Sequence, residues 1–190
     1  MKGKWQYDRK HSFHPISRRG GRPRRAIRRI YAGLPLRCVY CHNPDTWLTE
    51  GGTPTDVDEL VRKALRFRPY WKNGGGVTVT GGEPLLQAEF VEEFFARLHE
   101  HGVHTALDTS GVGNLSKAEK VLAHTDLVLC DLKFLTKADY LKNCRADFDQ
   151  IERTRLTAML VAAGFGMWLC QSDRWYGPFA PRQPRELSQL

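Results

Sequence analysis

The sequence lacks the features that would place it in a membrane or secreted class. Its longest apolar runs, such as Leu156 to Phe165, fall short of the roughly 20 residues that a membrane-spanning helix needs. No apolar segment follows the basic N-terminus, as a secretory signal would require. The five cysteines are odd in number and scattered, which argues against a disulfide framework. We therefore expect a cytoplasmic protein in a reducing compartment, with no membrane partner.

Acidic residues are almost absent from the first 30 positions. This stretch holds eleven lysines and arginines against one acid, Asp8, so it carries a net charge of +10. The whole chain carries +8, which leaves −2 on the remaining residues. A basic arm favours binding to nucleic acid, because lysine and arginine neutralise phosphates. A nucleic-acid module using residues 1–30 is therefore an alternative, but the rest of the chain is not basic and we expect no nucleic-acid partner.

The 190 residues fit a single folded domain. Within it, three zones differ in their charge and in the regularity of their residue patterns. Residues 1–32 form a basic, atypical N-terminal segment, residues 33–165 a regular body, and residues 166–190 an atypical tail. Only in the body do helix caps, hydrophobic periods and turn residues agree with one another. We expect the fold and the function to reside there.

Strands and helices alternate in this regular body. The predicted helices run from a cap at Thr55 to a stop at Pro69, over 87–100 with Gly102 as the end signal, over 116–124 behind a Ser116/Glu119 capping box, and over 148–163. β-Branched and apolar runs predict strands over 77–80, 104–108 and 126–132. The alternation predicts an α/β fold with parallel strands, in which ligands bind at the carboxyl ends of the strands.

Cys38 and Cys41 form a C-x-x-C pair. Redox dithiols, zinc sites and iron–sulfur clusters share this spacing, and two buried thiols are the plain alternative. A closed zinc site needs four ligands, and His42 would still leave zinc short of them. The remaining cysteines offer no second C-x-x-C; they are Cys130, Cys144 and Cys170.

A Gly-Gly-Glu sequence, residues 81–83, follows the first predicted strand. Glycines without a Cβ let a ligand approach the backbone, and the carboxylate can accept hydrogen bonds from an ammonium or hydroxyl group. The alternative is a plain glycine turn with a solvated acid. Two other strand ends carry charged or hydroxyl side chains, at Asp108-Thr109 and Asp131-Leu132-Lys133.

Several motifs together carry a resemblance to a known family. They are the run CHNPDTW with its C-x-x-C, residues 38–47, the segment 74–87 that contains GGEPLLQ, the run LDTSG at 107–111, and the run DLK at 131–133. In order and spacing they resemble the pyruvate formate-lyase activating enzymes, which are glycyl-radical-enzyme activases of the radical S-adenosylmethionine superfamily. The resemblance spans roughly residues 33 to 153.

The resemblance implies a partial (βα)6 TIM-like barrel with parallel strands, truncated at its C-terminal end. It also implies a [4Fe–4S] cluster on a C-x-x-x-C-x-x-C loop, whose fourth iron binds S-adenosylmethionine. Reductive cleavage of that cofactor yields methionine and a 5′-deoxyadenosyl radical. The radical removes a hydrogen atom from a glycine of the protein substrate, pyruvate formate-lyase. A flavodoxin-type protein or a similar reductant would supply the electron.

Residue by residue, the resemblance implies that Cys38 and Cys41 are metal ligands. The residues that it places at the cofactor are Tyr40, His42, Gly81, Gly82, Glu83, Asp108, Thr109, Asp131 and Lys133. Tyr40 and His42 would border the adenosine, and Glu83 would accept from the ammonium group of the methionine end. Asp108, Thr109 and Asp131 would lie near the methionine and a monovalent cation. Lys133 would lie on the cofactor side, with a solvated charge at a strand end as its alternative. No residue is assigned a catalytic role.

The family pattern breaks at Leu34, which stands where the first cluster cysteine belongs. Leucine has no lone pair for iron, and two thiolates alone would hold a cluster poorly. A catalytically inactive remnant of such an enzyme, without this cysteine and the last barrel units, is therefore the alternative function.

A shifted reading frame would explain the missing cysteine. Ile30 to Leu34 can be encoded so that, read one nucleotide later, they spell Phe-Met-Gln-Gly-Cys, which resembles the family. Gly21 to Arg24 can similarly become Asp-Gly-Pro-Gly. We hypothesise that the region between Phe13 and Pro35 is translated out of frame, and that the tail from Gly166 onward has a similar origin.

Overall fold

The computed structural model describes residues 5–7, 26–31, 33–41, 44–47, 53–71, 75–112, 115–131, 133–134, 136–146, 167–171 and 174–179. Its strands are β1 (Trp5–Tyr7), β2 (Ala26–Tyr31), β3 (Thr53–Thr55), β4 (Gly76–Gly81), β5 (His104–Thr109), β6 (Leu127–Asp131), β7 (Met167–Gln171) and β8 (Arg174–Phe179). Its α-helices are α1 (Val57–Leu65), α2 (Ala88–Glu100), α3 (Leu115–Leu122) and α4 (Lys137–Cys144). Short 3-10 helices are η1 (Pro44–Thr46), η2 (Arg68–Tyr70) and η3 (Pro84–Gln87).

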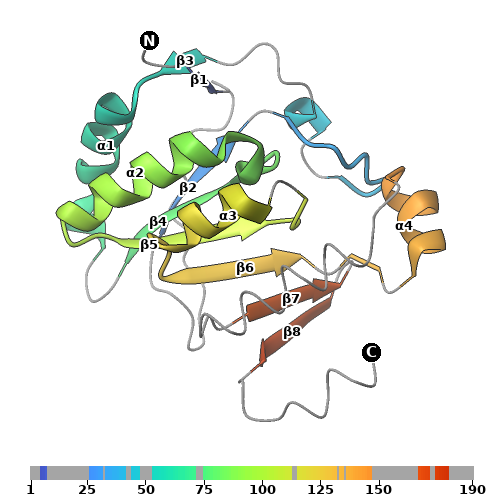
Figure 1. Ribbon diagram of the computed structural model, residues 1–190. Helices are drawn as coiled ribbons and strands as arrows, with labels where there is room; N and C mark the ends of the chain where they lie inside the picture. The colour runs from blue at the N-terminus through green and yellow to red at the C-terminus, as the bar shows by residue number, and fades with distance from the viewer. Residues whose placement is uncertain are drawn as a thin grey trace.

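The strands form one sheet in the order β3-β1-β2-β4-β5-β6-β7-β8. Every pair from β2 to β7 is parallel, and the pairs outside this range are antiparallel. Helices α1, α2 and α3 lie on one face of the sheet, while α4 lies beyond the ends of the strands (Figure 1). The structure thus confirms the α/β fold with parallel strands that the alternation of elements predicts.

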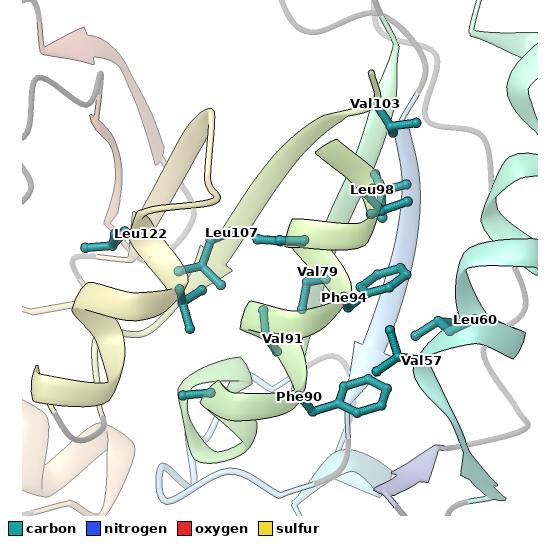
Figure 2. Close-up of a cluster of buried hydrophobic side chains, with 14 of the residues drawn as sticks. Val57, Leu60, Val79, Phe90, Val91, Phe94, Leu98, Val103, Leu107 and Leu122 are labelled. Carbon is teal, nitrogen blue, oxygen red and sulfur yellow. The ribbon is translucent and has the colours of Figure 1, made fainter. Parts of the chain in front are cut away.

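Helix α2 carries the centre of the hydrophobic core. Its 3.6-residue period buries Phe90, Val91, Phe94, Phe95 and Leu98, which are the residues predicted to share one face. Each such side chain stabilises the fold by about 1.5–3 kcal/mol when it is fully buried. Figure 2 shows the rings of Phe90 and Phe94 on the side of α2 that faces Val57 and Leu60 of α1. The helix ends as predicted, because Gly102 takes a φ of +64° and donates its N–H to the carbonyl of His99.

Two predicted helix caps are wrong. Thr55 ends β3, where it is paired with Trp5, and Asp56 caps α1 by accepting from the amide of Glu59 at 2.7 Å. Helix α1 also ends at Leu65, ahead of the predicted stop. Helix α3 begins at Leu115, so Ser116 lies inside the helix instead of capping it. The strands that were predicted over 77–80, 104–108 and 126–132 are confirmed to within two residues.

Helix α4 was not predicted, although its start carries a local signal. Thr136 caps it by accepting from the amide of Asp139 at 3.1 Å, and its hydroxyl donates to that residue's carboxylate at 2.7 Å. The helix predicted over 148–163 lies outside the described residues. Within the described residues, no helix is long and apolar enough to cross a membrane.

Both zones with atypical sequence contribute strands to the sheet. Strand β2, from the basic N-terminal segment, pairs in parallel with β4 along its whole length, from Ala26 opposite Gly76 to Tyr31 opposite Gly81. Strand β7, from the tail, pairs in parallel with β6. The division into three zones, which rests on residue patterns in the sequence, stays a prediction.

Candidate functional site

The candidate site lies at the carboxyl ends of the parallel strands, where the fold brings the predicted motifs together. Residues 33–41, called here the cysteine loop, follow β2, and the Gly-Gly-Glu turn ends the neighbouring strand β4. The amide of Glu83 donates to the carbonyl oxygen of Gly33 at 2.6 Å. Gly33 in turn donates to the carbonyl of Thr46 at 2.9 Å. The start of the cysteine loop is therefore fixed directly against the turn.

Glu83 is fully buried, and its carboxylate joins the ends of β4 and β5. One oxygen, Oε1, accepts from the amide of Leu85 at 3.0 Å and from the hydroxyl of Thr109 at 2.6 Å. The other, Oε2, accepts from the amide and the hydroxyl of Ser110 at 2.9 and 2.5 Å. Gly81 allows the turn because its φ of +123° is a conformation that residues with a Cβ rarely adopt. The Gly-Gly-Glu sequence is thus not a plain turn with a solvated acid.

Burial raises the pKa of Glu83 to about 7, although the donors on Ser110, Thr109 and Leu85 all act to lower it. Loss of hydration outweighs the four hydrogen bonds because the carboxyl group has no exposed surface. Both carboxylate oxygens are occupied by donors from the same chain. The contact between Glu83 and a cofactor ammonium group stays a prediction.

The next two strand ends present the other predicted side chains. Asp108 is half-buried and accepts from the hydroxyl of Thr80 at 2.8 Å. Lys133 forms a short ion pair with Asp131, with 2.6 Å between Nζ and Oδ2, and the Lys133 side chain is only 18% exposed. Burial acts to lower the pKa of Lys133, but the charge of Asp131 outweighs it and raises that pKa. The lysine is therefore a paired, partly buried charge and not a solvated one.

The cysteine loop is held against the last turn of α4 by its backbone. The amide of Arg37 donates to the carbonyl of Cys144 at 2.7 Å, and the amide of Val39 donates to the carbonyl of Asn143 at 2.9 Å. These bonds satisfy carbonyl groups that a helix end leaves without partners. They flank Cys38 on both sides, so its position relative to α4 is set by the main chain.

Cys38 meets a thiol that the sequence did not single out. Its Sγ lies 3.4 Å from Sγ of Cys144, and both side chains are buried. The hydroxyl of Tyr40 lies 3.9 Å from the same sulfur of Cys144. The hydrogen bond from Cys38 lowers the pKa of Cys144 to about 7, while the same bond and burial raise the pKa of Cys38. Burial also raises the pKa of Tyr40.

An apolar cluster surrounds these groups, separate from the main core. Its buried members are Leu36, Cys38, Tyr140 and Cys144, and the partly buried side chains packed against it are Leu34, Cys41, Val112, Phe134 and Ala146. Cys41 closes a tight turn by donating its amide to the carbonyl of Cys38 at 3.0 Å. Tyr40 and Tyr140 both contact the ring of Phe134, at centroid distances of 6.1 and 5.8 Å. His42 and Leu132 lie outside the described residues.

Leu34 is held in the same loop by Arg37. The guanidinium group of Arg37 donates to the carbonyl oxygens of Leu34 and Trp47 and lies over the Trp47 ring, 5.4 Å from its centroid. The side chain of Leu34 packs against the apolar cluster to which Cys38 and Cys144 belong.

The donor chemistry suits an iron–sulfur group, which requires thiolates in a largely apolar setting. Three thiols, on Cys38, Cys41 and Cys144, belong to or pack against one apolar cluster. They are not assembled around a common point, since the described part of the chain contains no group of three or more Cys, His, Asp or Glu side chains arranged to hold a metal ion.

Known proteins with similar sequences support the grouping of these motifs. The chain is 49% identical over 112 residues to the pyruvate formate-lyase-activating enzyme of Clostridium pasteurianum, a match that covers 58% of this chain and 47% of the relative. It is 50% identical over 118 residues to the enzyme of that name from Staphylococcus aureus strain USA300, with the same coverage. These identities confirm the resemblance. The chain spans about half the length of the curated relatives that it matches.

A solved structure shares the fold at low sequence identity. The crystal structure of SuiB from Streptococcus suis bound to S-adenosylmethionine matches with a TM-score of 0.53 and 16% identity, over 74% of this chain and 30% of that one. This likeness agrees with the predicted partial barrel. The family model described as the radical SAM superfamily matches residues 29–167, which contain the cysteine loop, the Gly-Gly-Glu turn and the strand ends of β5 and β6. With more than half of its length matched in this way, the chain belongs to the radical SAM superfamily.

Proposed function

We propose that this chain acts as an activase, which reductively cleaves S-adenosylmethionine at a [4Fe–4S] cluster and generates a glycyl radical on pyruvate formate-lyase. The observation that carries the proposal is the contact between the cysteine loop and the Gly-Gly-Glu turn, with Gly33 and Glu83 joined at 2.6 Å. This contact supports the proposal because it joins the loop that contains Cys38 and Cys41 to the turn that contains Gly81 and Gly82. The high identity to activating enzymes named for pyruvate formate-lyase supports the choice of protein substrate.

The chain's own residues would bind and orient the cofactors. Cys38 and Cys41 would hold the cluster, and the turn at Gly81-Gly82 would let the methionine end of S-adenosylmethionine approach the backbone. Asp108, Thr109 and Asp131 lie on adjacent strand ends, where they can support the methionine moiety and a monovalent cation. The bound cluster would supply the electron that breaks the sulfonium bond.

Glu83 and Lys133 would act mainly through the positions they maintain. Glu83 holds the ends of β4 and β5 together through Thr109 and Ser110, which keeps the turn rigid. Lys133 holds Asp131 in one orientation and would add positive charge beside a carboxylate of the cofactor. Tyr40 would border the adenosine from the cysteine loop, together with His42.

The remaining partners follow from the same proposal. A flavodoxin-type protein or a similar reductant would deliver the electron, and the glycyl radical enzyme would dock at the carboxyl ends of the strands. The cytoplasm suits this chemistry, because reduced thiols and an oxygen-sensitive cluster both persist there.

A second function, a catalytically inactive remnant, is favoured by one specific residue. Leu34 stands in the cysteine loop where the family pattern has a cysteine, and it cannot ligate iron. In that case the chain would fold as described and hold no cluster.

Anaerobic reconstitution tests the proposal against the remnant. The chain is incubated with iron and sulfide without oxygen, and the metal content and the formation of 5′-deoxyadenosine on reduction are measured. The activase should bind about four irons and four sulfides per chain and cleave S-adenosylmethionine. A Cys41→Ser variant should lose both properties, whereas Cys130→Ala, in the separate main core, should keep them. A chain that folds, remains free of iron and forms no 5′-deoxyadenosine would be the remnant.

A further inference from the structure

The end of α4 brings two buried thiols into direct contact. Sγ of Cys38 lies 3.4 Å from Sγ of Cys144, so no other atom fits between the two sulfurs. The described part of the chain holds no group of three or more Cys, His, Asp or Glu side chains arranged for a metal ion. The contact is therefore that of a thiol pair, and its chemistry has to be sought in the two sulfurs themselves.

The main chain fixes where the two cysteines meet. The amide of Arg37 donates to the carbonyl of Cys144 at 2.7 Å, and the amide of Val39 donates to the carbonyl of Asn143 at 2.9 Å. These bonds lie on either side of Cys38, and Cys144 is the last residue of α4. The thiols therefore meet whenever the cysteine loop packs against the helix, and the contact does not depend on side-chain rotamers alone.

The two sulfurs can be joined with little movement. A disulfide has a sulfur–sulfur distance of about 2.05 Å, so the sulfurs of Cys38 and Cys144 need to approach by about 1.4 Å from their present 3.4 Å. A small rotation about the Cα–Cβ bond of each side chain brings them closer. The bond would connect the cysteine loop to α4 across 106 positions of the chain.

The described residues single out Cys144 as the partner of Cys38. The C-x-x-C spacing suggests Cys41 instead, but Cys41 contacts Cys38 through its amide, which donates to the carbonyl of Cys38 at 3.0 Å. Cys130 lies in the separate main core, and the side chain of Cys170 lies outside the described residues. The sulfur contact of Cys38 in this part of the chain is with Cys144.

We propose that Cys38 and Cys144 form a reversible disulfide when the chain meets a peroxide, as a redox-sensitive switch between the cysteine loop and α4. One thiol reacts with hydrogen peroxide to give a sulfenic acid and one water. The sulfur of the other thiol displaces the hydroxyl group, which leaves with that thiol's proton as a second water, and the sulfur–sulfur bond forms. The two sulfurs together lose the two electrons that reduce one peroxide to two waters. A dithiol reductant reverses the bond by exchange.

The surroundings of the pair favour a small, uncharged oxidant. Leu36 and Tyr140 belong to the same buried apolar cluster as the two cysteines. Cys144 is 0% exposed, whereas Cys38 is 5% exposed and its neighbour Val39 lies largely in solvent. Peroxide therefore reaches the pair from the side of the loop. The inference does not depend on the proposed function, although closing the bond would withhold Cys38 from the role that the proposed function gives it.

Peptide mapping of the oxidised full chain tests the proposal. The chain is reduced, freed of metal with a chelator and treated with hydrogen peroxide at neutral pH. The remaining thiols are alkylated under denaturing conditions, counted by mass spectrometry and mapped in a digest made without reductant. The five thiols of the reduced chain should fall to three, with one linkage, between Cys38 and Cys144. Dithiothreitol should restore all five. The same oxidation in urea should give a mixture of linkages, because the unfolded chain no longer selects the pair.

Three variants serve as controls, and the unchanged chain decides the outcome even where a variant folds poorly. Cys144→Ala should lose the linkage, whereas Cys41→Ala and Cys130→Ala should keep it. A linkage between Cys38 and Cys41 in the unchanged chain would overturn the proposal. So would five thiols that survive the peroxide, oxidation of Cys38 and Cys144 to sulfinic acids without a linkage, or the same mixture of linkages with and without urea.

Discussion

Ser110 donates twice to one carboxylate oxygen of Glu83, from its amide nitrogen at 2.9 Å and from its hydroxyl at 2.5 Å. The other oxygen receives the amide of Leu85 and the hydroxyl of Thr109. Each oxygen thus faces one backbone N–H group, which cannot reverse its direction, and one hydroxyl group, which can rotate. This single carboxyl group therefore links the ends of two neighbouring strands.

Glu83→Gln should destabilise the fold by about 1–3 kcal/mol, because either orientation of the amide places its NH2 group against a backbone N–H. Urea unfolding followed by circular dichroism measures the change. Glu89→Gln is the matched control, since Glu89 forms an exposed ion pair with Lys117 at 3.0 Å and should cost less than about 1 kcal/mol. Equal stability of the two variants would mean that the Glu83 network contributes nothing specific.

Stability should fall as the pH rises from about 4.5 to above 7. The pKa of Glu83 is raised to about 7 in the folded chain, so folding favours its protonated form. Its contribution is complete below the unfolded pKa of 4.5 and is lost as the pH passes through the folded value. The full change amounts to about 3 kcal/mol. The unfolding free energies of the native chain and of Glu83→Gln are measured across this pH range. The difference between them should fall as the pH rises, and a difference that does not change with pH would contradict the prediction.

Arg145→Gly should stabilise the chain by about 1 kcal/mol. Arg145 follows α4 with a φ of +51°, in the left-handed region, where glycine has no steric cost. Arg66 follows α1 with a φ of −59° and is the matched control, because Arg66→Gly should destabilise by about 0.5–1 kcal/mol. Thermal unfolding measures whether each substitution stabilises or destabilises the chain. A change in stability of the same sign in both variants would contradict the prediction.

Lys133→Met should weaken binding of S-adenosylmethionine by about tenfold or more, because the proposed charge-assisted contact with the cofactor would be lost together with the ion pair that orients Asp131. Titration calorimetry with the reconstituted protein measures the affinity. Lys63→Met removes a lysine of similar ion-pair length, 2.5 Å to Glu59, from the surface of α1 and should leave the affinity unchanged. An unchanged affinity in Lys133→Met would limit Lys133 to a structural role.

The gene should carry codons at positions 21–24 and 30–34 that spell Asp-Gly-Pro-Gly and Phe-Met-Gln-Gly-Cys when they are read one nucleotide later. Sequencing the gene from independently prepared DNA tests this expectation. Codons incompatible with the shifted reading would end the frame-shift hypothesis and leave Leu34 as a genuine feature of the protein.

The sequence correctly predicted the helices and strands whose positions depend mainly on neighbouring residues. The apolar period of α2 and the β-branched run of β4 each agree with the structure to within two residues. The capping residue of α1 was predicted wrongly, because Thr55 and Asp56 are both residue types that can cap a helix. The choice depends on the pairing of Thr55 with Trp5 in β1, about fifty positions away. Such pairing leaves no trace in the neighbouring residues.

The same limit applies to the candidate site. The motifs at the strand ends indicated which segments meet, and the contact between Gly33 and Glu83 agrees with that grouping. The sequence could not show whether Glu83 is solvated or buried, because its donors on Thr109 and Ser110 come from the next strand. Cys144 was missed because 106 positions separate it from Cys38 and no motif marks it.

The sulfur contact between Cys38 and Cys144 also bears on how the molecule is made. A chain that emerges from the ribosome exposes the cysteine loop long before α4 has been synthesised. Closing a loop of 106 positions is slow compared with forming a helix, so this corner is completed late. During that interval the thiol of Cys38 is not yet covered by α4, so it reaches its buried state only when the last turn of that helix is in place.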